Sequence, residues 1–379
     1  MLFSPEFHEP LTARGWDEAW VGAQIERIAD DAVAAVGDDG LWPMHPSDYD
    51  QGDEDYVRHG LYMGAAGMVW GLRTLGFEPP SHDLYAHYLA EPDWPGVVPG
   101  YLIGESGILL ASRQIDDRLH DAILRNVGNP TNELMWGAPG TMLAALYAYE
   151  ATGEQRWADA WRASAEELWA RWPAGELWTQ DMYETISVYI GPAHGFAGNV
   201  RSLWLGRDLL DDTRAAELER RAIETTTALA FRADGLANWA PNPGPLAHRD
   251  RIRVQWCHGA PGMVASLASL GREDEAFGAL LSEAGELTWR AGSLATGLGL
   301  CHGTAGNAVA FLALLDRTGD ERWLDRARRF AVHALEQVQR ERARHGFGRY
   351  TLWTGDLGAA VVAKSCLDGR PGMPSLDWL

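Results

Sequence analysis

Two cysteine–histidine pairs, each followed directly by glycine, are the residues of this sequence best suited to chemistry. Cys257-His258 stands in the stretch WCHGAPG, and Cys301-His302 in the closely similar stretch LCHGTAGN. Thiolate and imidazole are preferred zinc ligands, and three protein ligands leave a fourth position for water or substrate, as in catalytic sites. We therefore expect zinc on Cys257, Cys301 and His302, although spacing alone leaves His258 as an alternative third ligand.

The two stretches are copies of one repeating unit. A G-x-x-G turn followed by a helix-like apolar segment occurs seven times, at intervals of 40, 33, 58, 64, 44 and 52 residues. Such intervals fit helical hairpins with variable connections. The unit is then an outer helix, a loop, a glycine turn and an inner helix. The turns begin at Gly64, Gly104, Gly137, Gly195, Gly259, Gly303 and Gly355.

Apolar residues at helical spacing predict an outer helix before each turn, and no stretch reads convincingly as a strand. An alternating array of this kind is expected to close into a ring, because each inner helix then buries both flanks. The sequence therefore predicts an all-α protein, an α/α toroid of seven inner and seven outer helices forming one domain, 1–379. The expected outer helices cover 16–36, 84–90, 116–127, 154–171, 212–231, 273–289 and 320–342.

Comparison of the seven turns singles out repeats four, five and six. The residues directly before the first glycine are Met63, Ile103, Trp136, His194, His258, His302 and Thr354. One position earlier stand Tyr62, Leu102, Met135, Ala193, Cys257, Cys301 and Trp353. Equivalent positions of a toroid lie at one height, so the histidines and cysteines are expected to converge at one mouth of the ring. His194 should face that mouth without a cysteine beside it.

Composition limits the possible partners. The chain has 46% apolar residues, 22% charged residues and a formal net charge of −21, so its long-range field would repel nucleic acid and anionic membranes. No apolar run approaches the ~20 residues that span a bilayer, and residues 1–16 lack a secretory pattern. We expect a cytoplasmic monomer.

Three cysteines argue against a disulfide framework, and Cys366 lies outside the turns. Arg249, Arg251 and Arg253 suggest a positive patch before Cys257.

These motifs resemble the lanthionine synthetase C-like family, which comprises bacterial cyclases and their eukaryotic relatives. The resemblance extends over essentially the whole chain and implies the same toroid. It also implies zinc on Cys257, Cys301 and His302. The family's proton-transfer histidine matches His194, in the stretch AHG, and an arginine of its site matches Arg253, four residues before the first zinc cysteine.

The differences favour the eukaryotic branch. The bacterial cyclases have an acid just ahead of the second turn, where residues 99–103 carry none. Glu105, inside that turn, matches an aspartate of the eukaryotic branch, and His258 is that branch's residue where cyclases often have tyrosine. We assign His258 to the catalytic group with His194 and Arg253. A lysine of this branch is Thr296 here, which leaves one glutathione contact without its residue.

The expected reaction is addition of a thiol to dehydroalanine or dehydrobutyrine, giving a thioether. Zinc would hold the thiolate, Arg253 would meet the enolate and His194 would supply the proton. The favoured thiol is glutathione and the acceptor a dehydroamino-acid-containing peptide or protein. The alternatives are a cyclase that closes lanthionine rings within one peptide, and a zinc-containing glutathione- or peptide-binding protein. A glycosidase on a six-hairpin toroid would need two facing carboxylates, which the turns do not offer.

Overall fold

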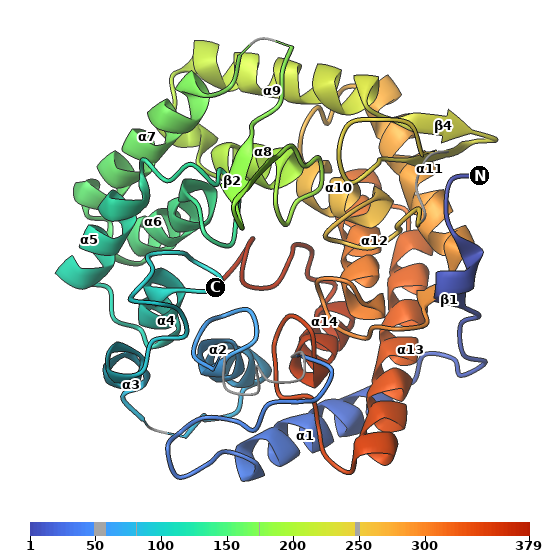
Figure 1. Cartoon of the computed structure of the whole chain (residues 1–379). Helices are drawn as coiled ribbons and strands as arrows, with labels where there is room; N and C mark the ends of the chain where they lie inside the picture. The colour runs from blue at the N-terminus through green and yellow to red at the C-terminus, as the bar shows by residue number, and fades with distance from the viewer. Residues whose placement is uncertain (49–57, 81, 174, 247–250) are drawn as a thin grey trace.

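The computed structural model describes residues 1–48, 58–80, 82–173, 175–246 and 251–379, and within them outer and inner helices alternate around a ring (Figure 1). The outer helices are α1 (Glu18–Ala34), α3 (Leu84–Ala90), α5 (Asp117–Asn126), α7 (Gln155–Ala170), α9 (Asp212–Ala228), α11 (Glu275–Ala291) and α13 (Arg322–His345). The inner helices are α2 (Ala65–Leu75), α4 (Glu105–Ala111), α6 (Ala138–Thr152), α8 (Phe196–Leu205), α10 (Ala260–Leu267), α12 (Thr304–Thr318) and α14 (Asp356–Asp368).

The inner helices close on themselves. Each packs against the preceding and the following inner helix, and α14 contacts both α12 and α2. The prediction of an α/α toroid with seven inner and seven outer helices is therefore confirmed. The outer helices begin at aspartate caps where the sequence provides them: Asp17 accepts hydrogen bonds from two N–H groups of α1, and Asp274 from one of α11, which satisfies donors at the helix start.

The inner helices begin differently, and this explains the G-x-x-G turn. In five of the seven inner helices of the described chain, the first N–H group donates to a backbone carbonyl seven residues earlier, as Thr304 does to Gly297 (3.0 Å). The first N–H group of α10 donates instead to Asn238 Oδ1 (2.8 Å). This folding back brings the second glycine against another carbonyl. A Cβ on Gly306 would lie 1.8 Å from the Leu300 oxygen, and at all seven second glycines the distance would be at most 2.3 Å. Only glycine fits this position.

A chain of backbone hydrogen bonds joins neighbouring turns. Its donors and acceptors are the residues two places before the first glycine: Cys257 N–H donates to Cys301 O (3.0 Å), and Cys301 N–H to Trp353 O (3.0 Å). Trp353 N–H then donates to Tyr62 O (3.1 Å) and Tyr62 N–H to Leu102 O (2.8 Å). These five equivalent residues therefore lie at one height, as the repeat comparison predicted.

The end of the chain fills the middle of the ring. Residues 370–379 follow α14 into the centre (Figure 1), where Met373 and Leu376 are buried. Tyr101 Oη donates to Ser375 O (2.6 Å), and the Arg201–Asp377 ion pair spans 2.6 Å. Tryptophans form much of the surrounding core, as expected for large aromatics at helical spacing. Those with almost no exposed surface are Trp157, Trp161, Trp178, Trp239, Trp256, Trp323 and Trp353.

The expectation of no strands is wrong. The described residues contain three two-stranded antiparallel sheets: β1 (His8–Glu9) with β6 (Ser293–Leu294), β2 (Gln180–Met182) with β3 (Thr185–Ser187), and β4 (Phe231–Ala233) with β5 (Leu236–Asn238). Strands of two or three residues are too short for alternation to reveal them. The β4–β5 hairpin also ends α9 at Ala228, earlier than the sequence suggested.

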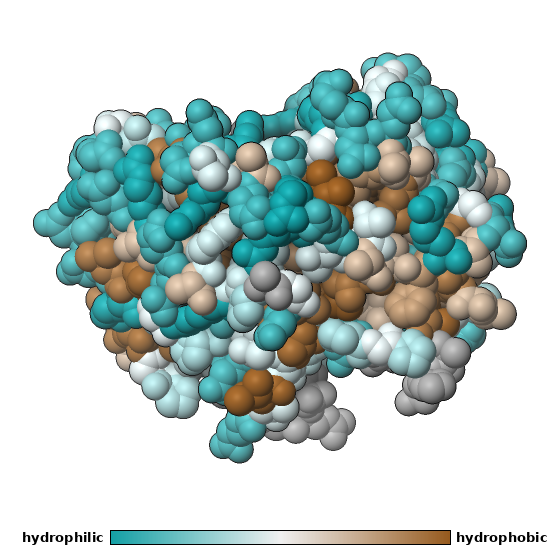
Figure 2. Space-filling model, turned by 90° about the horizontal axis from the view of Figure 1, so that it is seen from above, coloured by the Kyte–Doolittle hydropathy of each residue, from teal (hydrophilic) through white to brown (hydrophobic). Residues whose placement is uncertain are grey.

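The outer surface is largely polar. Helix α9 buries only Leu218, Ala222 and Thr226, and hydrophilic residues cover most of the face on its side of the molecule, with smaller apolar groups between them (Figure 2). Within the described part of the chain, no helix combines the length and apolar character needed to cross a bilayer.

Candidate metal centre and its surroundings

The fifth and sixth turns bring together three side chains that can bind a metal. The Sγ atoms of Cys257 and Cys301 and a ring nitrogen of His302 all lie within 4.8 Å of one another. Both cysteines are buried, whereas His302 is exposed at the mouth. Within the described ranges, this is the one group of three or more His, Cys, Asp or Glu residues close enough to share an ion.

The pKa values of the two thiols are shifted in opposite directions. The hydrogen bond between Cys257 and Cys301, with a further contribution from His302, holds the pKa of Cys257 well below its ordinary value despite burial. The same contact, together with burial, raises the pKa of Cys301. Tyr62, from the first turn, makes a further side-chain hydrogen bond with Cys301.

His258 does not belong to the group of three side chains that could share an ion. The first glycine of its turn, Gly259, has φ +113°, whereas the equivalent glycine of every other turn has a negative φ. The chain folds tightly here, with Gln255 and His258 paired through their backbones. The His258 ring lies 5.7 Å from that of Tyr189. Burial, opposed by Cys257 and reinforced by His194 and Arg253, lowers the pKa of His258.

His194 is paired with a buried acid. Its Nδ1 lies 3.0 Å from Glu133 Oε2, and the Glu133 side chain has no exposed surface. Backbone N–H groups of Met135 (2.9 Å) and Trp136 (2.5 Å) also donate to this carboxyl group. Burial alone would lower the pKa of His194, but the hydrogen bond and the charge of Glu133 outweigh it and raise the pKa above its ordinary value. Tyr189 stands between the rings of His194 (5.9 Å) and His258.

Two of the three arginines of the predicted basic patch, Arg251 and Arg253, lie within the described residues. Arg253 lies close enough to His258 and to Arg251 to influence the pKa of both. The Arg251 guanidinium stacks 3.8 Å from the centre of the Phe7 ring, so it belongs to the contact with the N-terminal segment. Arg249 lies outside the described residues.

Glu105 is not part of this site. It is buried at the start of α4, forms an ion pair with Arg125 and accepts a hydrogen bond from Tyr85 Oη (3.1 Å). It therefore joins α4 to the neighbouring outer helices. The acid beside the site is Glu133, which precedes the third turn, whereas the sequence comparison looked for an acid at the second. Cys366 is buried in α14, and burial raises its pKa to about 12.

The N-terminal segment supports both ligand-bearing loops. Ser4 exchanges hydrogen bonds with Ile252, ahead of Cys257, through its N–H (3.2 Å) and its Oγ (2.9 Å). Further along, strand β1 pairs with β6, and Leu294 N–H of β6 donates to Thr304 Oγ1 (3.2 Å), two residues after His302.

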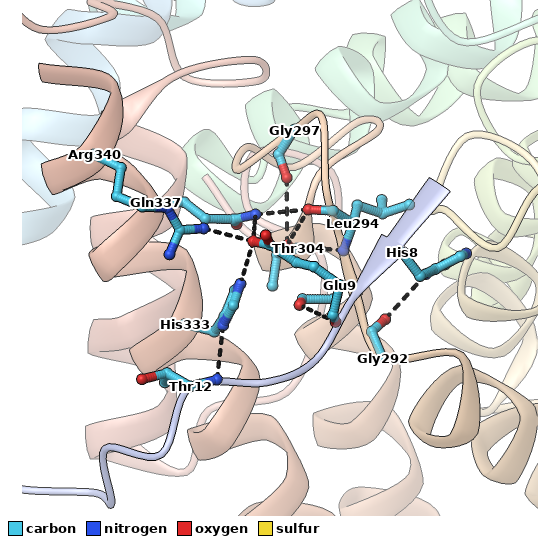
Figure 3. Close-up of polar contacts among 11 residues, drawn as sticks. His8, Glu9, Thr12, Gly292, Leu294, Gly297, Thr304, His333, Gln337 and Arg340 are labelled. Carbon is cyan, nitrogen blue, oxygen red and sulfur yellow. Dashed lines mark hydrogen bonds and ion pairs between the residues drawn. The ribbon is translucent and has the colours of Figure 1, made fainter. Parts of the chain in front are cut away.

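Glu9 fixes that segment to helix α13 (Figure 3). Its Oε1 accepts hydrogen bonds from His333 Nε2 (2.7 Å), Gln337 Nε2 (3.2 Å) and Arg340 (2.5 Å). Gln337 also donates to Leu294 O (2.6 Å). One carboxylate oxygen thus joins the outer helix to the sheet that carries the sixth loop.

Two supporting residues escaped the sequence comparison. Glu133 holds His194, and Gln255 Nε2 donates to Cys257 Sγ at 2.9 Å. Both stand four places before the first glycine of their turn. The residues there, in chain order, are Gly60, Gly100, Glu133, Gly191, Gln255, Gly299 and Thr351. Comparison of the seven repeats at this third position would have found them, because only three of the repeats have a polar side chain there and the other four have glycine.

The donor set suits a metal ion. Two thiols and an imidazole are the ligand types of zinc, and burial leaves the Cys257 sulfur, with its lowered pKa, in need of a positive partner. The exposed His302 leaves one side open toward the mouth. These residues therefore fit a metal held by three protein ligands.

Comparisons with known proteins agree with this fold and show the family. Residues 104–371 match the family model described as lanthionine synthetase C-like protein. The chain therefore belongs to the lanthionine synthetase C-like family. The structure of this chain superposes on that of nisin cyclase with a TM-score of 0.63, over 91% of this chain and 93% of that one, at 15% sequence identity, which is a likeness of fold alone.

Two relatives match over shorter stretches. The chain is 31% identical over 230 residues to the glutathione S-transferase LANCL1 of Danio rerio, covering 56% of this chain and 54% of that protein. It is 41% identical over 106 residues to the LanC-like protein GCL1 of Arabidopsis thaliana, covering 26% and 24% of the two chains. The chain thus spans about half or less of these relatives' length.

Proposed function

We propose that this protein is a zinc-dependent enzyme that adds a thiol to dehydroalanine or dehydrobutyrine, with glutathione as the thiol and a dehydroamino-acid-containing peptide or protein as the acceptor. The observation that carries this proposal is the convergence of Cys257, Cys301 and His302 beside the His194–Glu133 pair. A metal-ligand set and an acid–base group at one mouth are what the reaction needs.

Cys257, Cys301 and His302 would hold the metal. Zinc supplies a Lewis acid that keeps the thiol of the substrate deprotonated near neutral pH. The bond that forms joins sulfur to Cβ of the acceptor, while the π electrons of the double bond move toward the acceptor carbonyl as an enolate. We assign the enolate oxygen to Arg253, as the cationic partner, and to neutral His258, as a hydrogen-bond donor.

His194 then completes the reaction. Glu133 accepts from Nδ1, which leaves Nε2 as the atom that can deliver a proton to Cα of the enolate. The raised pKa of His194 keeps a proton available near neutrality. The proton lost by the thiol replaces it, so the net change is addition of S–H across the double bond.

Glutathione is favoured because a relative 31% identical to this chain is named a glutathione S-transferase. The likeness to nisin cyclase reaches only the fold. Lanthionine ring closure within one peptide, and zinc-dependent binding of glutathione without turnover, are therefore left as outcomes that the experiment separates.

The experiment mixes the protein with glutathione and a dehydroalanine peptide and follows the peptide by mass spectrometry. Gain of one glutathione supports the proposal. A second peptide carries its own cysteine; ring closure leaves its mass unchanged but removes the thiol that iodoacetamide would alkylate. Glutathione binding by calorimetry, with neither product, would indicate a binding protein.

Two cysteine variants test the proposed metal site. Metal analysis should give about one zinc per chain for the wild type and little for Cys301→Ala, whereas Cys366→Ala, which removes the buried thiol of α14, should keep both zinc and activity. Circular dichroism should show the helices intact after zinc removal, because the ring of helices packs without the metal. Full zinc occupancy in Cys301→Ala contradicts the site.

A further inference from the structure

The amide of Gln255 lies against one of the two sulfurs of the metal centre. Its Nε2 is 2.9 Å from Cys257 Sγ, and the side chain is only 6% exposed. Four of the other turns have glycine at this position, so a side chain here is a departure from the repeat. It occurs in one of the two turns that carry a cysteine.

The backbone of the fifth turn holds this contact. Gln255 N–H donates to His258 O (3.2 Å), and His258 N–H donates to Gln255 O (3.1 Å). This short antiparallel pair folds the chain tightly around Cys257. The left-handed conformation of Gly259, which a side chain would strain, completes the turn. The amide is therefore held beside the sulfur by a local structure that the other six turns lack.

We propose that Gln255 is a positioning residue that tunes the Cys257 thiolate toward zinc. The N–H group occupies one lone pair of the sulfur and withdraws part of its negative charge, which directs the remaining lone pairs to the metal. Hydrogen bonds of this kind orient metal ligands and adjust their donor strength. The inference rests on the zinc site of the proposed function and adds a determinant outside the ligand set.

When cobalt(II) replaces zinc, the absorption spectrum of the metal centre reports on this hydrogen bond. Loss of an N–H donor makes a thiolate easier to oxidise, so its charge-transfer band to cobalt moves to longer wavelength. Gln255→Leu removes the donor and leaves an apolar side chain of similar volume. Gln255→Met, which keeps the unbranched stem of glutamine, is the second variant, in case Leu hinders folding. We expect a band shift to longer wavelength and a zinc dissociation constant raised about 10-fold, within the range for such supporting residues.

Asn307→Ala is the matched control. Asn307 Nδ2 donates to Val254 O (2.9 Å), so it supports the same loop without contacting a sulfur. Loosening of the loop can weaken zinc binding in this variant but leaves the cobalt band in place. An unmoved band in folded Gln255→Leu and Gln255→Met, with or without weaker zinc binding, overturns the inference. If the wild type binds neither cobalt nor zinc, the proposed function itself has failed.

Discussion

His194 Nδ1 and Glu133 Oε2 lie 3.0 Å apart, although the two residues come from different turns, 61 positions apart in the sequence. Glu133 is buried and His194 has 23% of its side chain exposed. The pair therefore combines a fixed inner partner with a ring that reaches the mouth, an arrangement that orients a group for proton transfer.

Replacement of His194 by alanine tests that role. We expect His194→Ala to bind zinc and to remain folded, but to slow thiol addition about 100-fold or more, the usual loss for an acid–base group. Zinc content, melting temperature and turnover should be measured on one preparation. A variant that loses stability yet keeps its turnover per folded molecule would show that His194 only supports the turn.

Glu133 should set the pH range of the reaction. Since the pKa of His194 is raised in the folded protein, its protonated form persists to higher pH, and activity that depends on this acid falls as pH rises through the raised value. Glu133→Gln removes the charge, so the falling limb of the pH–rate profile should move to lower pH. A limb that stays in place would assign it to another group.

Replacement of Glu9 should lower the free energy of unfolding markedly, although this residue lies near the N-terminus. Glu9→Ala leaves His333, which is buried, and Gln337 without their common acceptor, and loss of buried hydrogen bonds costs about 2 kcal/mol of unfolding free energy. Urea denaturation measures this. The control is Glu224→Ala, which removes an exposed partner of Arg220 and should cost under about 0.5 kcal/mol. Equal losses would contradict a structural role for Glu9.

The second glycine of each turn should tolerate no side chain. In Gly358→Ala the new Cβ would lie 2.1 Å from Leu352 O, and the backbone must move, at a cost of about 2–3 kcal/mol. Gly22 lies inside α1 with no atom within 4 Å of its added Cβ, so Gly22→Ala should raise stability by up to about 1 kcal/mol. Thermal unfolding of both variants compares them. A harmless Gly358→Ala would mean that the carbonyl contact is not what requires glycine.

Much of the fold could be predicted because the sequence repeats one structural unit. The spacing of the glycine turns predicted the toroid, and α3 was predicted to the residue, since local apolar spacing and caps define a helix. The convergence of Cys257, Cys301 and His302 also followed from repeat position. Their metal binding and the roles of His194, Arg253 and His258 stay predictions.

What the sequence did not show depends on distant or unrepeated contacts. Strand β1 meets β6 across more than 280 residues through two residue pairs, and no periodicity marks so short a pairing. Glu133 and Gln255 stand four residues before the first glycine of their turns, outside the two positions from which the site was predicted. Glu105 was matched to a family aspartate by its place in a turn, with no role assigned. Its neighbours, Arg125 and Tyr85, come from outer helices whose positions the motif does not specify.

The chain segment that fills the centre of the ring bears on the order in which the two proposed substrates would bind. Residues 370–379 occupy the centre of the ring, where they contact Tyr101, Tyr147 and Arg201. In the proposed reaction the thiol and the acceptor would then both approach from the mouth at which His302 is exposed. The thiol would bind against the buried Cys257 and Cys301, so an acceptor that arrives first would stand in its path. Steady-state kinetics should then show ordered addition with the thiol as the leading substrate, and excess acceptor should inhibit.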